Sequence, residues 1–137
     1  YNIQVQVSDD SLTTTQQLVV TVKDIFEEPE GLTVLAGSLT GSYGDENGQG
    51  TASKFKNPYG MKLDKANGYM YIGDTGNHKI KRVDLNNNYE VTTIFSQEST
   101  ILNGASVFKG PIEIILDEDM MYVIEFHNHR LSKIVEP

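Results

Sequence analysis

The second half of the chain repeats an earlier stretch of itself, and this internal repeat constrains the fold more than any other feature. Pro58 and Leu63-Asp64 recur as Pro111 and Leu116-Asp117, in each case 53 positions later. After a turn that is shorter by two residues, the order continues at a spacing of 51 positions, with Tyr71 and Tyr122, Asp74 and Glu125, Asn77-His78 and Asn128-His129, Ile80 and Leu131, and Val83 and Ile134. Units that recur in this way bury their apolar faces against one another, so we expect a repeat architecture.

Each unit consists of short segments separated by turn-forming residues. Residues 59–64, 69–74, 79–83 and 90–95 make up the first unit. Asn67-Gly68 predicts a type I′ hairpin turn, in which both central residues need φ > 0, and the three asparagines at 86–88 predict another turn. Four short strands joined by tight turns make one blade of a β-propeller. Since no stretch of about ten residues has the 3.6-residue period of a helix, the sequence predicts an all-β fold with a partial propeller.

The N-terminal 30 residues differ from the rest in composition. They contain six acidic residues and one basic residue. Ile3, Val5 and Val7 alternate with polar residues, and residues 18–22 alternate again, which predicts two β-strands. Residues 24–30 are acidic and contain a proline, as expected of a linker. Because a two-stranded hairpin alone is marginal in water, we assign residues 1–30 to the end of one domain and residues 31–137 to two propeller blades.

Two family resemblances follow from these residues. The run Asn57-Pro58-Tyr59-Gly60 and the later run from Asp74-Thr75-Gly76 to Ile80 closely resemble the NHL repeat, with residues 34–38 as its usual lead-in. The second copy is similar but has Glu125-Phe126-His127 in place of the Asp-Thr-Gly step. This resemblance implies a propeller that serves as a recognition platform for protein or RNA ligands, although a few related propellers are lyases or hydrolases with metal in the central channel.

Residues 1–30 resemble the last two strands and the linker of a cadherin-like domain, an immunoglobulin-like sandwich. The carrying runs are Val7-Ser8-Asp9, residues 18–22 and residues 24–29. The resemblance implies a calcium site whose donors are Asp9, Asp24, Glu27 and Glu28, with Asp10 as a weaker candidate, because calcium prefers carboxylate and carbonyl oxygens. Phe26 stands where such linkers usually have Asn, so a solvated acidic linker is the alternative.

Two other patterns suggest metal sites that the sequence does not complete. The loop from Asp45 to Gly50 has a glycine at the sixth position of an EF-hand, but its twelfth position holds Lys56 instead of an acid. His78 and His129 occupy the same repeat position, and with His127 they form no recognisable set of zinc ligands. We therefore expect structural roles for this loop and for the histidines.

Paired carboxylates raise the possibility of catalysis. Asp74 and Glu125 occupy equivalent positions, and we expect them to accept hydrogen bonds that fix the turns before the Asn-His pairs rather than to perform acid–base chemistry. The nucleophile-elbow pattern Gly-x-Ser-x-Gly does not occur. The sequence therefore predicts no catalytic residues, no enzyme and no cofactor other than calcium.

Charge and composition narrow the class of partner. The formal net charge of −8 argues against a nucleic-acid ligand, since affinity for phosphate comes mainly from Lys and Arg. We interpret the basic residues of the third strands as an outer polar face; they are Lys79, Lys81, Arg82, Arg130 and Lys133. The chain has no Cys and no apolar run long enough for a transmembrane helix. Together with the cadherin resemblance, this predicts a bacterial extracellular or cell-surface location.

Two blades cannot close a propeller, which needs four or more. Residues 32–36, Leu-Thr-Val-Leu-Ala, are expected to form an outermost strand, and the last blade ends after its third strand. Either the chain is a segment of a longer protein with more blades, or residues 32–36 of a neighbouring chain complete the last blade in a ring or filament.

The leading hypothesis is a non-catalytic extracellular adhesion, scaffold or ligand-binding module. Its partner would be a protein or glycan ligand, or copies of the chain itself. The alternatives are a self-assembling structural protein and a fragment of a propeller lyase or hydrolase.

Overall fold

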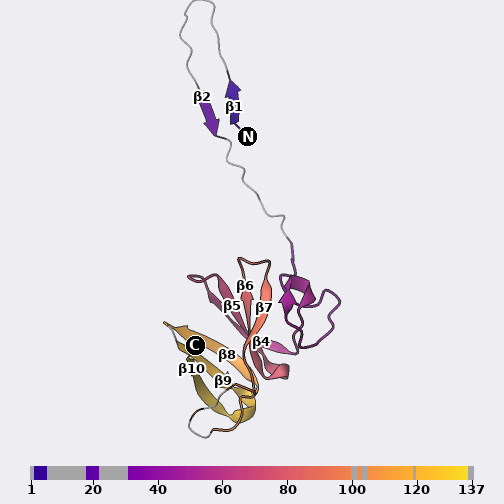
Figure 1. Ribbon diagram of the computed structural model, residues 1–137, viewed down its shortest axis with the longest axis vertical. Coiled ribbons are helices and arrows are strands. Elements are labelled where there is room, and N and C mark those ends of the chain that lie inside the picture. Colours follow the sequence, from indigo (N-terminus) through magenta and orange to yellow (C-terminus); the bar gives the residue numbers. More distant parts are fainter. Residues whose placement is uncertain are drawn as a thin grey trace, which may run out of the picture. The chain divides into compact units, whose positions relative to one another are not determined.

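The computed structural model describes residues 2–5, 18–21, 31–99, 102, 105–118 and 120–135. The chain divides into two compact units, Tyr1–Leu32 and Thr33–Pro137 (Figure 1). In the first unit, β1 (Asn2–Val5) and β2 (Leu18–Thr21) form a two-stranded antiparallel sheet, in which Asn2 lies opposite Thr21. The two strands that the sequence predicts here are confirmed.

The second unit contains a five-stranded sheet in the order β3-β7-β6-β5-β4. Its strands are β3 (Gly48–Gln49), β4 (Pro58–Asp64), β5 (Tyr69–Asp74), β6 (Lys79–Asp84) and β7 (Glu90–Phe95). Two single-turn 3₁₀-helices, η1 (Gly50–Ala52) and η2 (Thr75–Asn77), lie in the connections. Strands β4 to β7 form an antiparallel meander, and they match the four strands predicted for the first blade.

A second antiparallel sheet follows in the order β10-β9-β8 (Figure 1). It contains β8 (Pro111–Asp117), β9 (Met120–Glu125) and β10 (Arg130–Val135), with the 3₁₀-helix η3 (Phe126–Asn128) between β9 and β10. The fold is all-β, as predicted, and its two sheets are consistent with partial propeller blades. Within the described residues, no helix is long and apolar enough to cross a membrane.

The repeat in the sequence is also a repeat in backbone conformation. The first strand of each blade carries an irregularity near its start, between Pro58 and Met61 in β4 and between Pro111 and Glu113 in β8. The 3₁₀-helices η2 and η3 are each followed by a histidine in the left-handed region, His78 at φ 56° and His129 at φ 51°. The recurrent Asn-His pair therefore marks the same tight turn in both blades.

The hydrophobic core lies between the two sheets. Its buried residues are Tyr71 and Ile80 from the first blade, and Phe108, Ile114, Met121, Val123 and Ile134 from the second. The rings of Phe95 and Phe108 meet edge to face, with centroids 5.0 Å apart. The blades thus bury their apolar faces against each other, as the repeat predicts.

Two glycines allow the close approach of the blades. A Cβ atom on Gly60 would lie 2.4 Å from the carbonyl oxygen of Ile112, and one on Gly73 would lie 2.9 Å from the carbonyl oxygen of Pro111. Backbone atoms cannot move aside as a flexible side chain can, so these positions require glycine. The hydroxyl of Thr75 also donates a hydrogen bond to the Pro111 carbonyl oxygen across the same junction.

The prediction of a strand at residues 32–36 is wrong for this structure. These residues have no regular secondary structure, and the side chain of Leu32 is 96% exposed. The edge of the first sheet is instead occupied by β3, which pairs with β7 through Gly48 opposite Val91. A short strand is stable only beside a partner, and residues 32–36 have none within the described part of the chain.

The predicted type I′ turn at Asn67-Gly68 is also corrected. Asp64 pairs with Tyr69, so the turn contains four residues, and only Gly68 among them has a positive φ, of 72°. The carboxylate of Asp64 accepts hydrogen bonds from the backbone N–H and the side-chain amide of Asn67. Because Asn67 is engaged in this way, the longer turn replaces the two-residue hairpin.

Candidate functional site

Two equivalent turns, one in each blade, are each fixed by a fully buried acid. Asp74 precedes η2 and Glu125 precedes η3. In the first blade, the carboxylate of Asp74 accepts hydrogen bonds from the Lys56 backbone N–H at 2.7 Å and from the Asn77 side-chain amide at 2.8 Å. The structural interpretation of this acid is therefore confirmed: it holds the turn before His78.

Lys81 shares this buried site, and its predicted place on an outer polar face is wrong. Its side chain is completely buried, and its ammonium lies 3.5 Å from the Asp74 carboxylate. The ammonium also donates a hydrogen bond to the Lys54 carbonyl oxygen at 2.8 Å and lies over the ring of Phe55. The segment that precedes β4 packs over this face of the sheet and buries Lys81. The alternation of residues within β6 alone does not indicate that a distant segment lies there.

The second blade holds its acid with a different cation. The Glu125 carboxylate accepts hydrogen bonds from the Lys109 backbone N–H, the Asn128 amide, the Arg130 guanidinium and the Ser132 hydroxyl. Burial by itself raises the pKa of Glu125, but these hydrogen bonds outweigh it and leave the pKa below its ordinary value. Glu125 is therefore an ionised structural acceptor, as predicted, in the same role as Asp74.

His78 links the two blades at the level of these turns. Its Nδ1 accepts a hydrogen bond from the Gly110 backbone N–H at 3.2 Å, which requires that nitrogen to be unprotonated. Burial, followed by the neighbouring charges of His127 and Lys109, holds the pKa of His78 below its usual value. The rings of His78 and His127 lie edge to face with centroids 5.5 Å apart.

A row of aromatic and basic side chains, exposed except for the half-buried His78, runs along these turns. We call it the turn strip and define it as Tyr43, Lys56, His78, Lys109, Phe126 and His127. Tyr43 is 75% exposed and Phe126 is 57% exposed, although both carry large aromatic rings. The Lys56 ammonium lies 5.8 Å from the centre of the Tyr43 ring, and the Phe126 and His127 rings are 5.4 Å apart. The strip therefore continues across both blades.

Sequence reasoning missed most of this strip, although the repeat contained a signal for it. Lys56 and Lys109 stand 53 positions apart, which is the same spacing as Pro58 and Pro111. Both lysines are exposed, and both use the backbone N–H to hold the buried acid of their blade. The basic residues that the strand pattern places on one face all lie on the third strands and do not include Lys56 or Lys109.

The residues considered as metal ligands fall partly inside and partly outside the described part of the chain. No group of three or more His, Asp or Glu side chains capable of holding a metal occurs among the described residues. His78 and His127 lie together, but the structure places no third such ligand with them in the part of the chain that it describes. The predicted calcium donors Asp9, Asp24, Glu27 and Glu28 lie outside the described residues, so that site stays a prediction.

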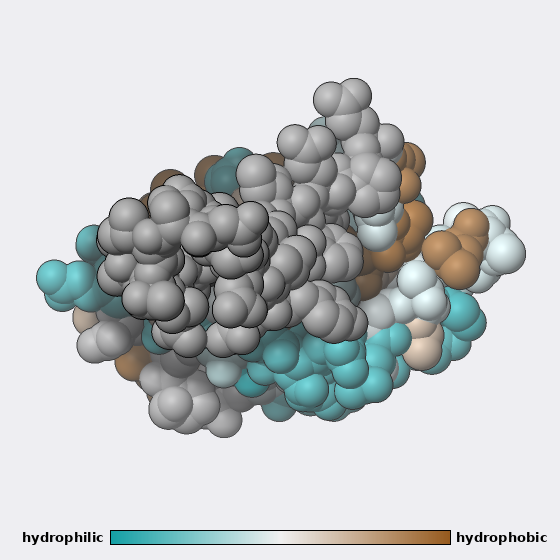
Figure 2. Space-filling view, turned by 90° about the horizontal axis from the view of Figure 1, so that it is seen from above, coloured by the Kyte–Doolittle hydropathy of each residue, from teal (hydrophilic) through white to brown (hydrophobic). Residues whose placement is uncertain are grey.

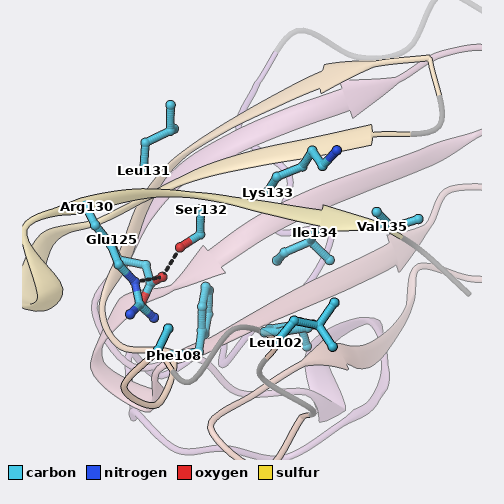
Figure 3. A pocket seen from close by; sticks show the side chains of 11 residues that line it. Leu102, Phe108, Glu125, Arg130, Leu131, Ser132, Lys133, Ile134 and Val135 are labelled. Atoms are coloured by element: carbon cyan, nitrogen blue, oxygen red, sulfur yellow. Dashed lines mark hydrogen bonds and ion pairs between the residues drawn. The ribbon is translucent and has the colours of Figure 1, made fainter.

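A groove borders the last strand of the second blade. Its volume is about 470 Å³, and all six residues of β10 line it, together with Phe95, Leu102, Ala105, Phe108 and Glu125. Figure 3 shows Leu131 and Lys133 on one side of β10 and Ser132 and Ile134 on the other, with the Glu125–Arg130–Ser132 cluster at one end. The groove therefore follows the strand edge and contacts both of its faces.

Comparison with known proteins gives matches in sequence and in structure. No family model matches the chain. Over 97 residues, it is 30% identical to NHL repeat-containing protein 2 from chicken (Gallus gallus) and 28% identical to the human protein of that name. The chain is similar to NHL-repeat proteins. Each match covers 66% of this chain but only 13% of the relative's length. The NHL resemblance of the blades thus has support from weak homology, whereas the cadherin resemblance stays a prediction.

Among the solved structures that share the fold is a structural genomics protein of unknown function from Bacteroides thetaiotaomicron VPI-5482, with a TM-score of 0.63 and 21% sequence identity. The match covers 96% of this chain and 32% of that protein. At this level of identity, the likeness supports the all-β fold and carries no functional argument.

Proposed function

We propose that the chain is a non-catalytic, protein-binding module and that the turn strip is its contact surface. The observation that carries the proposal is the exposure of two large aromatic rings, Tyr43 and Phe126, together with the exposed side chain of Lys56, whose ammonium lies 5.8 Å from the centre of the Tyr43 ring, and the exposed side chain of Lys109. Exposed aromatic side chains supply contact area at a low entropic cost and are enriched in protein interfaces. Weak homology to NHL-repeat proteins agrees with a binding role.

The rigidity of the turns supports this assignment. The buried carboxylates of Asp74 and Glu125 hold the backbone at Lys56 and Lys109, respectively. The basic side chains of the strip therefore project from fixed points instead of from a loose loop. Surfaces that are already in their bound shape lose less conformational entropy when a ligand binds.

The charge of the strip indicates the chemistry of its ligand. Lys56 and Lys109 are two cations within a chain of formal net charge −8, and His78 is held neutral. Two lysines with aromatic neighbours suit a protein segment that carries carboxylates and at least one apolar side chain. A nucleic acid is a weaker fit, because the acidic chain as a whole repels a phosphate backbone.

The proposal also includes an extracellular or cell-surface location and a calcium site in the N-terminal part of the chain. We place the module outside the cell or on its surface, on the strength of the cadherin-like pattern in residues 1–30. Calcium would then bind at the junction through Asp9, Asp24, Glu27 and Glu28. Isothermal titration of the chain with CaCl₂, compared with an Asp9→Asn/Asp24→Asn variant, measures this directly, and equal heats for the two proteins would remove calcium from the proposal.

The binding role is tested with a displayed library of random 12-residue peptides selected against the whole chain. We expect the enriched peptides to be acidic and to bind about tenfold more weakly to a Lys56→Glu/Lys109→Glu variant, because each reversed charge turns an attraction into a repulsion. A Lys62→Glu/Lys65→Glu variant is the matched control, since it makes the same change in net charge at β4 and its turn. Equal losses in both variants would mean that net charge, and not the strip, determines binding.

A further inference from the structure

Two histidine rings, one from each blade, lie around a single buried glycine at the junction of the blades. Gly110 is buried and has a φ of 68°. Its N–H donates a hydrogen bond to Nδ1 of His78 in the first blade, at 3.2 Å. A Cβ atom on Gly110 would lie 2.1 Å from Nδ1 of His127, so the bare backbone leaves room for that ring. The glycine thus holds the two rings in edge-to-face contact, with centroids 5.5 Å apart.

The hydrogen bond from Gly110 determines which nitrogen of His78 carries the proton. A nitrogen that accepts a hydrogen bond has no proton, so the neutral ring is protonated on Nε2. The structure gives this Nε2–H no acceptor in the part of the chain that it describes. A metal ion on Nε2 would require the proton to move to Nδ1 and face the Gly110 N–H, and ligating histidines normally donate from their other nitrogen. The ring therefore offers a hydrogen-bond donor to a ligand, which suits an anion and not a metal.

Lys56 is held in place near this ring. The N–H of Gly76 donates a hydrogen bond to the Lys56 carbonyl oxygen at 2.8 Å, and a Cβ atom on Gly76 would lie 2.8 Å from Cγ of the lysine. The stem of Lys56 therefore packs on bare backbone, while its ammonium lies 5.8 Å from the centre of the Tyr43 ring. Its charge reaches His78, because it is among the charges that lower the pKa of that histidine, after burial and the larger effects of its other neighbours.

The positive charges at the junction have no acidic partners of their own. Lys109, directly before Gly110, also lowers the pKa of His78 through its charge. Among the described residues, neither Lys56 nor Lys109 forms an ion pair. The buried carboxylates of Asp74 and Glu125 pair with other cations of their own blades. The junction therefore carries two uncompensated positive charges within a chain of formal net charge −8.

We propose that this junction is an oxyanion site and that it binds the phosphate group of a phosphorylated side chain in the protein segment that the turn strip recognises. The inference rests on the proposed binding function and specifies the ligand. A phosphate monoester carries a charge of about −1.5 to −2 near neutral pH and has three acceptor oxygens. The ammonium groups of Lys56 and Lys109 match this charge, and the Nε2–H of His78 supplies a further donor. A carboxylate would leave one of the two positive charges unmatched.

The acidity of the chain favours a phosphorylated peptide over a nucleic acid. Both ligands carry phosphate, but a nucleic acid has a negative charge at every phosphodiester, and a chain with a net charge of −8 repels such a polyanion. A peptide places one phosphate at the junction and presents its neighbouring side chains to Tyr43 and Phe126, which are 75% and 57% exposed. The peptide is therefore the better match.

Inorganic phosphate tests the site without a peptide. Hydrophobic residues are exposed beside hydrophilic ones on the face that Figure 2 views, and apolar surface binds peptides whatever their charge, whereas phosphate has no apolar part. The whole chain, labelled with ¹⁵N, is titrated at slightly alkaline pH, where phosphate is mainly the dianion. Phosphate should shift the His78 ring nitrogens and the Gly110 amide in a saturable way, and sodium chloride of equal ionic strength should not. Identical shifts with the two salts would overturn the proposal.

Two variants and one spectrum make this test specific. Lys56→Gln/Lys109→Gln should abolish the shifts, whereas Lys62→Gln/Lys65→Gln, which makes the same change in net charge at β4 and its turn, should retain them. Loss of the shifts in both variants would show a response to net charge alone and would contradict the site. The ¹⁵N spectrum of the free chain should also show the His78 proton on Nε2. A proton on Nδ1 would remove the donor on which the proposal depends.

A peptide series tests the phosphate in its protein setting. In the tightest peptide from the display selection, each acid in turn is replaced by phosphoserine or by glutamate. At one position the phosphoserine form should bind about tenfold more tightly than the glutamate form, through the added charge and acceptor oxygens. Lys56→Gln/Lys109→Gln should lose this gain. Equal affinities at every position would refute a phosphate anchor, and tighter binding of a single-stranded oligonucleotide would assign the site to nucleic acid.

The two experiments separate this inference from the proposed function. If no peptide is selected, the proposed function fails, and the phosphate titration still decides whether the junction binds an oxyanion. If acidic peptides bind through the turn strip but phosphate shifts neither His78 nor Gly110, the proposed function stands and the phosphate site is wrong.

Discussion

The ammonium group of Lys81 lies 3.5 Å from the carboxylate of Asp74, and both side chains are completely shielded from solvent. A buried ion pair gains little stability over an apolar pair, because both charges leave water. Removing Lys81 is different, since it leaves the Asp74 carboxylate buried without its cation, whereas without Asp74 the Lys81 ammonium would still lie 3.4 Å from the Asp45 carboxylate. This pair therefore makes the first blade sensitive to a single substitution that conserves volume.

Lys81→Met is expected to lower the free energy of unfolding by about 3–5 kcal/mol, as for other broken buried ion pairs. Asp74→Asn/Lys81→Met should recover part of this loss, because the double change leaves no unpaired charge. Urea unfolding followed by circular dichroism measures both effects. Lys65→Met, in an exposed turn, is the matched control and should change stability by less than about 0.5 kcal/mol. If Lys81→Met behaves like this control, the pair does not stabilise the blade.

Gly60→Ala is expected to destabilise the junction between the blades. The new Cβ atom would lie 2.4 Å from the Ile112 carbonyl oxygen, so the two backbones must separate, at a cost of about 1–3 kcal/mol. Gly31→Ala is a suitable control, since nothing lies within 4 Å of its Cβ position. The midpoint of thermal unfolding measures both variants. An unchanged midpoint for Gly60→Ala would show that the blades can separate without loss.

The lowered pKa of His78 predicts that the folded protein loses stability in mild acid. Its pKa is held below the ordinary value of 6.5 in the folded chain, chiefly by burial and then by His127 and Lys109. As the pH falls below 6.5, the unfolded chain takes up the proton more readily than the folded chain does, so the free energy of unfolding decreases. The decrease should level off once the pH is below the folded pKa.

His78→Asn should remove this part of the pH dependence while tolerating the left-handed backbone. Urea unfolding between pH 5 and pH 8, roughly the range in which histidine titrates, gives the slopes. His129→Asn is the control, because it makes the same change at the equivalent turn. Parallel pH slopes for wild type and His78→Asn would contradict the assignment.

Two phenylalanines allow the effect of a core side chain to be compared with that of a side chain on the turn strip. Phe108 is buried against Phe95, so Phe108→Ala should cost about 3–5 kcal/mol of stability through the cavity that it leaves. Phe126 is exposed, and Phe126→Ala should leave stability nearly unchanged but weaken the binding of selected peptides. Urea unfolding and peptide titration of the two variants form a reciprocal test. Unaltered peptide affinity in Phe126→Ala would exclude Phe126 from the contact surface.

The strands could be predicted from the sequence because their signals are local. Predicted boundaries of 59–64 and 79–83 differ by one residue from β4 and β6. The structural role of Asp74 and Glu125 also followed, because both acids precede the same Asn-His pair at the same spacing. In a repeat each structural position occurs twice in the sequence, so a local pattern found in both copies gives a firmer prediction.

Predictions that depended on partners distant in the sequence were less successful. Residues 32–36 have the composition of a strand, but a strand forms only where another edge is available. Lys81 lies in a strand whose pattern indicates an exposed face, and it is buried by the Lys54–Phe55 stretch some 26 residues away. The turn strip was missed for the same reason, since its members come from separate connections.

The sequence by itself determined that this protein is a pair of β-sheet repeats, because strand periodicity, turn residues and the repeat spacing are all encoded within short stretches. Only the tertiary structure decided which charged groups are buried and which aromatic side chains gather on the turn strip. These properties depend on how closely distant segments approach, as where the Lys54–Phe55 stretch covers Lys81 and where Gly60 and Gly73 meet the second blade.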